Sequence, residues 1–359
     1  MTRPAQAILD LPALSHNLTR VRQLAPGRRI MAVIKANGYG HGMVKTAEAL
    51  READAFAVAC LDEAVILREA GITQPLVLLE GFFDASELRP LTQHQLITVV
   101  HHEDQLAILE RSRLDAPLPV WIKVDSGMHR LGLAPAKLAE IWKRLTACGP
   151  LQVLGFMTHL ANADYRNDPL TLLQLKNFTE AVDAYPGQHS IANSAAILNW
   201  PQTHGDWVRP GIMLYGVSPF ADSSGASHGL KPVMSLHSRL MAVNHFQRGD
   251  RVGYGGEWEC PEDMPVGVVA IGYGDGYPRH AKAGTPVLVN NKRVPLIGRV
   301  SMDMICVDLR GQAQARSGDP VCLWGEALPV EEVARYAGTI PYELLCRVTS
   351  RVHFRSEQA

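Results

Sequence analysis

A single lysine stands where a short apolar run gives way to a glycine-rich stretch. The run covers residues 30–34, Lys35 follows it, and Gly38, Gly40 and Gly42 come next. A lysine in this place has three interpretations. It can be solvated at the surface, the usual fate of lysine, or it can bind a phosphate as a point charge. Its amine can also attack a carbonyl carbon and form a Schiff base, which requires a lowered pKa because an ordinary lysine is protonated at neutral pH.

The glycines allow a bound phosphate but match neither common nucleotide motif. Glycine lets the backbone approach a ligand closely. The segment GHGMVKT (40–46) lacks the G-K-[ST] ending of a P-loop. The segments GYGHG and GYGDG are G-x-G-x-G, so the G-x-G-x-x-G fingerprint of a dinucleotide site is absent as well. Binding of a smaller cofactor with one phosphate remains possible. The three interpretations of Lys35 also remain open.

Composition narrows the class of protein. The chain has 359 residues, a formal net charge of -1 and 47% hydrophobic residues, which suggests about two globular domains. The balanced charge points to neither nucleic acid nor a membrane surface as partner. No apolar run approaches the roughly 18 residues of a membrane span, and MTRPAQAILD lacks the apolar core of a signal peptide. The six cysteines form no C-x-x-C pair. We therefore expect a cytoplasmic protein with free thiols and no metal site.

Alternating apolar and amphipathic segments predict a barrel in the first part of the chain. Stretches such as 62–71, 103–112 and 135–149 have helical character and separate eight apolar runs. Eight strands with crossover helices favour an N-terminal (β/α)8 TIM-type barrel over residues 1–230, whose chemistry would sit at the carboxyl ends of the strands. Lys35 has such a position. The eight runs cover residues 30–34, 56–60, 76–79, 96–100, 120–124, 153–157, 189–192 and 208–214.

The pattern changes after about residue 218. Short strand-like runs separated by turn signals predict a mostly β C-terminal domain over residues 231–359, with a single helix at about 330–337. Pairing of the first ten or so residues with this second domain is left open. The runs cover residues 234–246, 266–271, 285–289, 294–297, 304–309 and 321–323.

The segment AVIKANGYGHG (32–42) resembles the pyridoxal-phosphate lysine motif of the alanine racemases, the fold type III enzymes that use pyridoxal 5'-phosphate (PLP). This resemblance covers nearly the whole chain and implies a PLP-binding barrel followed by a β domain. The further matching segments, in the family's order, are WIKVDSGMHRLGL (121–133), MTHLANAD (157–164), HSIANSAAIL (189–198), VRPGIMLYG (208–216), VGYGGEW (252–258), AIGYGDGYPR (270–279), GRVSMDMICVD (298–308) and PYELLCRVTSRV (341–352).

The resemblance implies two catalytic residues. Lys35 would carry PLP covalently and act as one base, and Tyr254 would act as the second base. Racemisation removes a proton from one face of a carbon and returns a proton to the opposite face. One base cannot easily reach both faces. A tyrosine has an ordinary pKa of about 10, and nearby cations would have to lower it.

The resemblance also implies binding residues. Arg209 would face the pyridine nitrogen, and Arg130 would bind the substrate carboxylate together with the Met302 backbone, with Tyr273 narrowing the entrance. Lys123 corresponds to a lysine that is often carbamylated, although an ion pair with Asp125 explains it equally well. Asn193 and Ser194 could instead form a plain helix N-cap. The residues implied to bind the cofactor are Lys35, Tyr39, His159, Asn193, Ser194, Arg209, Gly211, Ile212 and Tyr342.

The implied function is the PLP-dependent interconversion of L-alanine and D-alanine. It would provide D-alanine for cell-wall peptidoglycan or serve alanine catabolism. The family further implies a homodimer whose active sites are shared between subunits, so that Tyr254 acts on the other chain's cofactor. Two alternatives stay open: a racemase of the same fold with serine or broad amino-acid specificity, and a non-catalytic PLP-carrying protein.

Overall fold

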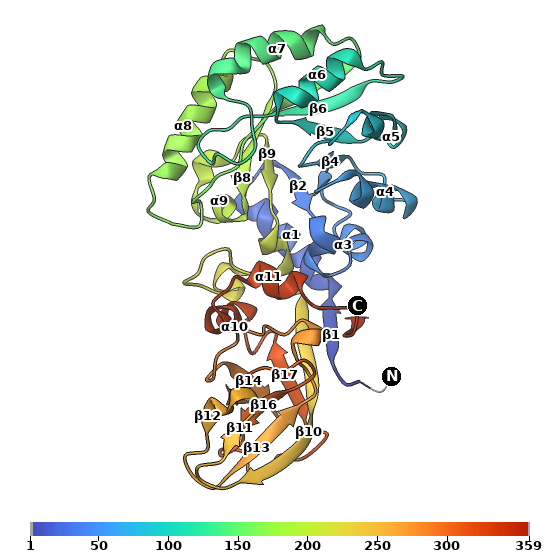
Figure 1. Cartoon of the computed structure of the whole chain (residues 1–359). Coiled ribbons are helices and arrows are strands. Elements are labelled where there is room, and N and C mark those ends of the chain that lie inside the picture. Colours follow the sequence, from blue (N-terminus) through green and yellow to red (C-terminus); the bar gives the residue numbers. More distant parts are fainter. Residues whose placement is uncertain (1–2, 358–359) are drawn as a thin grey trace. The chain divides into compact units, whose positions relative to one another are not determined.

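The computed structural model describes residues 3–357 and divides into two compact units (Figure 1). One unit is Ser15–Leu214, and the other combines the described residues up to Leu14 with those from Tyr215 onward. The expected boundary at residue 230 is therefore too late. The segment after Leu214 joins the second unit because Oε1 of Glu331 accepts the backbone N–H groups of Ser218 at 2.9 Å and Gly225 at 2.8 Å.

The first unit is a closed barrel of eight parallel strands, as predicted. Strands buried on both faces read as continuous apolar runs, which is why the sequence reveals them. The barrel closes where the first strand pairs with the last, with Ile30 opposite Val208. The strands are β2 (Arg29–Val33), β3 (Ala55–Val58), β4 (Leu76–Leu78), β5 (Ile97–Val100), β6 (Leu118–Lys123), β7 (Leu151–Met157), β8 (Gln188–Asn193) and β9 (Trp207–Arg209).

Amphipathic helices follow most of these strands. In α7, Leu138, Ile141 and Leu145 recur at helical spacing and are buried. In α6, Glu103 and Asp104 occupy the first turn, where negative charge complements the helix dipole. The helices are α1 (Leu11–Leu24), α3 (Met43–Ala49), α4 (Leu61–Glu69), α5 (Leu88–Gln93), α6 (Glu103–Arg111), α7 (Leu138–Ala147), α8 (Leu170–Val182) and α9 (Ser194–Asn199), with the short α2 (Lys35–Tyr39) after the first strand.

The second unit is mostly β, as predicted, around an eight-stranded sheet of order β13-β16-β15-β14-β17-β10-β1-β18. The prediction of a single helix is wrong, because a second short helix begins at Pro341, a residue well suited to a first helical position. The elements are β1 (Gln6–Asp10), β10 (Met234–Phe246), β11 (Arg251–Val252), β12 (Trp258–Glu259), β13 (Met264–Val269), β14 (Pro286–Val289), β15 (Lys292–Ile297), β16 (Ile305–Asp308), β17 (Pro320–Trp324), α10 (Val330–Ala337), α11 (Pro341–Cys346) and β18 (His353–Glu357).

Strand β1 lies inside this sheet rather than at its edge. It runs antiparallel to β10, with Gln6 opposite His237, and parallel to β18, with Gln6 opposite His353. Its side chains alternate between buried and half-buried, as expected for a strand with one covered face. The first and last strands of the chain are therefore neighbours.

Among residues 3–357, no helix combines the length and the apolar character that crossing a membrane requires. All six cysteines are free thiols. Within the same range, no group of three or more His, Cys, Asp or Glu side chains is arranged to hold a metal ion.

Candidate active site

Lys35 follows β2 and opens a backbone turn of unusual conformation. Ala36, Asn37, Gly38 and Tyr39 all have positive φ angles, of 52°, 54°, 63° and 51°. This left-handed conformation costs about 1–2 kcal/mol for each non-glycine residue. Backbone strain of this kind persists only where the surroundings impose it, and it gathers at functional sites.

Two side chains hold this turn. The carboxylate of Glu63 on α4 accepts the backbone N–H of Ala36 at 2.7 Å and that of Ala59 at 2.8 Å. Asn37 Oδ1 accepts the N–H of Met43 at 3.0 Å and so joins the turn to α3. The sequence gives no specific signal for Glu63, because an acidic residue in a first helical turn is explained by the helix dipole alone.

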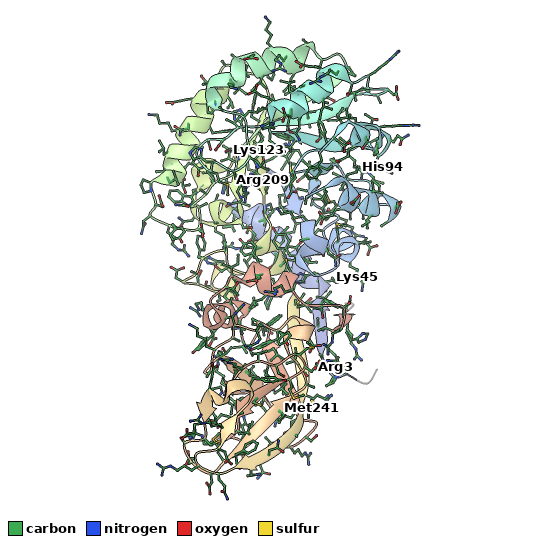
Figure 2. All side chains as sticks on the ribbon, in the orientation of Figure 1. Arg3, Lys45, His94, Lys123, Arg209 and Met241 are labelled. Atoms are coloured by element: carbon green, nitrogen blue, oxygen red, sulfur yellow. The ribbon has the colours of Figure 1, made fainter. Side chains whose placement is uncertain are left out.

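Four cationic side chains come from the carboxyl ends of barrel strands or from the loops beyond them. Burial, followed by the charges of Arg209, Arg130 and Lys35, lowers the pKa of Lys123 to about 8, while Glu80 opposes the shift. Figure 2 labels Lys123 and Arg209 inside the barrel unit. None of the four cations forms an ion pair with a carboxylate among the residues that the structure describes.

Arg209 is buried at the end of β9 and is held by three oxygen atoms. Its Nη1 donates to Ser190 Oγ at 2.6 Å, and its Nη2 donates to the carbonyl oxygens of Thr158 at 2.5 Å and Ile191 at 3.3 Å. Burial lowers its pKa to about 10, so the guanidinium stays charged at neutral pH. The three bonds fix the plane of the guanidinium.

His159 follows β7 and belongs to the same surroundings. Desolvation, followed by the charge of Arg209 and then of the other three cations, holds its pKa well below the ordinary value of histidine. The imidazole is therefore neutral at neutral pH. A neutral ring can pack beside a bound group or offer one donor and one acceptor nitrogen.

Lys123 does not pair with Asp125, the alternative that the sequence left open. The Asp125 carboxylate instead accepts the backbone N–H groups of Gly127, Met128 and His129 at 3.0–3.1 Å, and its second oxygen lies 3.1 Å from His129 Nδ1. Asp125 therefore closes its own loop. The positive charge of Lys123 is left without a carboxylate partner in the described chain.

The ends of β8 and β9 meet through Ser194. Its Oγ accepts the backbone N–H of Gly211 at 2.8 Å and that of Met213 at 3.4 Å. Asn193 caps α9 by accepting the N–H of Ala196 at 3.1 Å, so the N-cap interpretation holds for that residue. A side chain at Gly211 would place its Cβ 2.6 Å from the Tyr39 hydroxyl, so the tyrosine side chain would have to move. Tyr39, Ser194 and Gly211 thus line one small region, followed by the buried Ile212.

These residues fit a cofactor that carries both a phosphate and a carbonyl group. Arg209 is buried and Lys35 and Lys123 are half-buried, and such cations without acidic partners are costly unless an anion compensates them. Lys35 supplies an amine beside that excess charge, and Ser194 supplies a hydroxyl at the point where phosphate commonly binds in such barrels. The donor set of the barrel unit therefore matches a phosphorylated aldehyde such as PLP.

The other predicted residues belong to the second unit. Tyr254 is 69% exposed, Met302 51% and Tyr273 40%, while Tyr342 lies in α11. The backbone N–H of Tyr273 donates to Ser301 O at 3.0 Å.

Two protein-family models match the chain. The alanine racemase N-terminal domain matches residues 9–219, and the alanine racemase C-terminal domain matches residues 233–356. The chain belongs to the alanine racemase family. The resemblance found in the sequence is thereby confirmed, and this alanine racemase is an enzyme of the isomerase class.

Individual relatives agree over nearly full length. An alanine racemase of Nitrosococcus oceani is 58% identical over 348 residues, which are 97% of this chain and 98% of the relative. The biosynthetic alanine racemase of Escherichia coli K12 is 54% identical over 350 residues, with the same coverage. The crystal structure of the biosynthetic alanine racemase from Pseudomonas aeruginosa is 48% identical with a TM-score of 0.97, over 99% of this chain and 100% of that one.

Proposed function

We propose that this alanine racemase interconverts L-alanine and D-alanine with PLP bound to Lys35, and that Lys35 and Tyr254 act as bases on opposite faces of the substrate. One observation carries the proposal. Lys35 follows the first barrel strand and opens a strained turn, among cations that have no acidic partner in the described chain. Such an amine is suited to hold an anionic carbonyl cofactor.

The residues of the barrel have distinct tasks in holding that cofactor. When bound, PLP supplies an aldehyde for covalent attachment and a ring that withdraws electrons from the substrate's α-carbon. Both acceptor positions of the Ser194 hydroxyl are used by Gly211 and Met213, so its proton is free to bond a phosphate oxygen. Arg209 can only donate, so beside the ring nitrogen of a bound PLP it would disfavour a proton on that nitrogen.

Two residues move the protons. The Lys35 amine takes or returns the α-proton on one face, and the Tyr254 hydroxyl does so on the other. Tyr254 projects from the β-rich unit with 69% of its surface exposed, which supports a role toward a second copy of the chain. We infer a homodimer in which Tyr254 of the partner subunit completes the site around Lys35.

The substrate carboxylate meets Arg130 and the Met302 backbone in this proposal, and Tyr273 and Tyr342 restrict the space to a methyl-sized side chain. With a pKa of about 8, Lys123 has an appreciable neutral fraction that can react with carbon dioxide. The carbamate formed would give Arg130 an anionic partner and fix its direction.

We infer a cytoplasmic enzyme that supplies D-alanine to peptidoglycan. Two relatives named as biosynthetic alanine racemases support this role over a catabolic one. The free thiols support a reducing compartment.

The decisive experiment incubates purified protein with L-alanine in deuterated water. Loss of optical rotation and loss of the α-proton are followed in the native chain and in Lys35→Ala, Tyr254→Phe and Tyr336→Phe. The first two variants should lose about 10²- to 10⁴-fold in rate, as is usual when an acid–base group is removed. Tyr336→Phe is the matched control, because Tyr336 is another exposed tyrosine of the β-rich unit. Near-native rates in both directions for Tyr254→Phe would refute the two-base assignment, and faster turnover of serine than of alanine would refute the substrate.

A further inference from the structure

A carboxylate with no solvent exposure lies in the same short loop as Tyr273. Asp275 is 0% exposed, and Arg3 binds it with two hydrogen bonds, from Nε to Oδ1 at 2.9 Å and from Nη2 to Oδ2 at 2.5 Å. Arg351 adds a second cation, with its Nε 3.4 Å from Oδ1. Asp275 also accepts the backbone N–H of Gly272 at 2.9 Å, which closes its own turn.

The same two arginines reach a second loop. Arg3 Nη2 donates to the carbonyl oxygen of Asp303 at 2.9 Å, and Arg351 Nη2 donates to Asp303 Oδ1 at 2.6 Å. Arg3 precedes β1 and Arg351 precedes β18, so neighbouring strands deliver them. We call Arg3, Asp275, Asp303 and Arg351 the positioning cluster. It ties the 272–277 loop to the 301–304 loop.

The two loops also bond through their backbones. Tyr273 N–H donates to Ser301 O at 3.0 Å, and Gly274 N–H donates to Met302 O at 2.9 Å. A Cβ at Gly272 would lie 2.3 Å from Ser301 O, and one at Gly274 would lie 2.3 Å from Arg351 Nη1. The loops are packed so closely that a shift of either one moves the other.

The side chains above this packed backbone are exposed. Tyr273 and Met302 present large surfaces to solvent, 40% and 51% exposed. The positioning cluster therefore rigidifies a surface and adds no apolar packing. Burying the Asp275 carboxylate between two partly exposed arginines is a poor way to gain stability alone, since well-packed apolar residues do as well. The positioning cluster is better explained by a need to hold a ligand-binding surface in a fixed geometry.

We propose that Asp275, with Arg3 and Arg351, positions the Tyr273 side chain and the Met302 backbone for the substrate. The inference rests on the proposed function, in which these two residues contact alanine. The cluster members are positioning residues and touch no reacting atom.

The test uses Arg351→Gln, Arg351→Lys and Arg3→Gln in the full-length PLP-loaded enzyme, at protein concentrations where activity per chain is constant. We expect Arg351→Gln and Arg3→Gln to raise the KM for L-alanine about tenfold, as expected when one hydrogen bond to a charged group is lost, with kcat within about threefold of native. Amide hydrogen exchange should accelerate in peptides covering 272–277 and 301–304. Arg351→Lys should restore part of both properties.

Arg310→Gln is the matched control. Arg310 binds the buried Asp308 at 2.8 Å in the same unit, at the end of β16 away from the 301–304 loop. The Arg310→Gln substitution should lower the stability of the protein and leave the KM for L-alanine unchanged. Unchanged KM and unchanged exchange in both Gln variants would overturn the inference, as would an equal rise in KM for Arg310→Gln. Persistent racemisation by Lys35→Ala would instead refute the proposed function. The hydrogen-exchange data would still test whether the positioning cluster holds the two loops.

Discussion

The Glu63 carboxylate binds the backbone N–H of Ala36 at 2.7 Å, and so fixes the residue directly after Lys35 from a different helix. Its other oxygen binds Ala59 beyond β3 at 2.8 Å. One side chain thereby connects the ends of two adjacent barrel strands. The left-handed turn that begins at Ala36 depends on such an outside hold, because its own backbone geometry is unfavourable.

Glu63→Gln should impair catalysis without unfolding the barrel. The amide keeps one acceptor oxygen but turns its NH2 group toward the other N–H, so one of the two bonds is lost. We expect kcat to fall about tenfold to a hundredfold through misplacement of Lys35. Borohydride trapping of PLP on Lys35 should slow in parallel. Asp62→Asn, an exposed neighbour in the same helical turn, is the control, and equal rates for both variants would disprove the role of Glu63.

Arg209→Lys should change the products as well as the rate. A lysine keeps the charge but cannot hold the three oxygens of Ser190, Thr158 and Ile191 in one plane. We expect a stability loss of about 1–3 kcal/mol in urea denaturation. Pyruvate formed per racemisation event, measured with lactate dehydrogenase, should rise because the ring nitrogen loses its fixed donor.

Arg29→Lys provides the comparison for that variant, since Arg29 lies at the start of β2 and stacks on Trp207 at 4.4 Å. It should leave the pyruvate ratio at the native value. A pyruvate ratio that stays native in Arg209→Lys would contradict the assignment of this arginine to the cofactor ring.

Lys123 should give the protein a distinct pH dependence. Its folded pKa is lowered to about 8, whereas an unfolded lysine has a pKa of about 10.4, so the unfolded chain binds more protons between these values. Stability should therefore rise with pH across this window, by about 3 kcal/mol in total. Subtracting the profile of Lys123→Met in buffer free of carbon dioxide isolates the contribution. A difference that stays flat or falls with pH would contradict the lowered pKa.

Carbamylation of Lys123 is open to direct observation. With 13C-labelled bicarbonate, we expect a carbamate signal in the NMR spectrum of the native enzyme that grows as pH rises through about 8, because the neutral amine is the reactive form. Lys123→Arg should lack the signal. A signal that survives this substitution would assign the carbamate to another amine.

Ser194→Ala should weaken cofactor binding. The change leaves the N–H groups of Gly211 and Met213 without their acceptor and removes a hydroxyl donor. We expect the Kd for PLP to rise about 10- to 100-fold, equivalent to about 1–3 kcal/mol. Absorbance titration measures it. Ser15→Ala is the control, because Ser15 also makes one hydrogen bond, to Ala49 O, but at the surface. Equal Kd values for PLP in Ser194→Ala and Ser15→Ala would contradict a role of Ser194 in binding the cofactor.

The barrel could be predicted because its strands are buried on both faces and therefore form continuous apolar runs. The boundary between the units could not. The segment 215–230 carries no strand pattern, and its attachment depends on Glu331, more than a hundred residues later. The helix α11 was missed because six residues are too few to show a helical period.

Some features of the candidate site could likewise be predicted from the sequence, and others could not. Lys35 could be predicted because the sequence shows both a reactive residue type and its position at the end of a predicted strand. The left-handed conformations of Ala36 and Tyr39 cannot be predicted from the sequence, since alanine and tyrosine rarely adopt them. The bond between Arg3 and Asp275 spans 272 residues, and only the folded chain reveals such a pairing.

The position of β1 between β10 and β18 has a consequence for biosynthesis. This strand precedes every other described strand in the sequence, yet its two neighbours are the strands at 234–246 and 353–357. During translation β1 has to wait until β18 has been synthesised, and long-range pairing of this kind is slow and exposes unpaired edges to aggregation. The β-rich unit is thus completed only after β18 has emerged from the ribosome, and a bulky group joined before β1 would delay this last pairing.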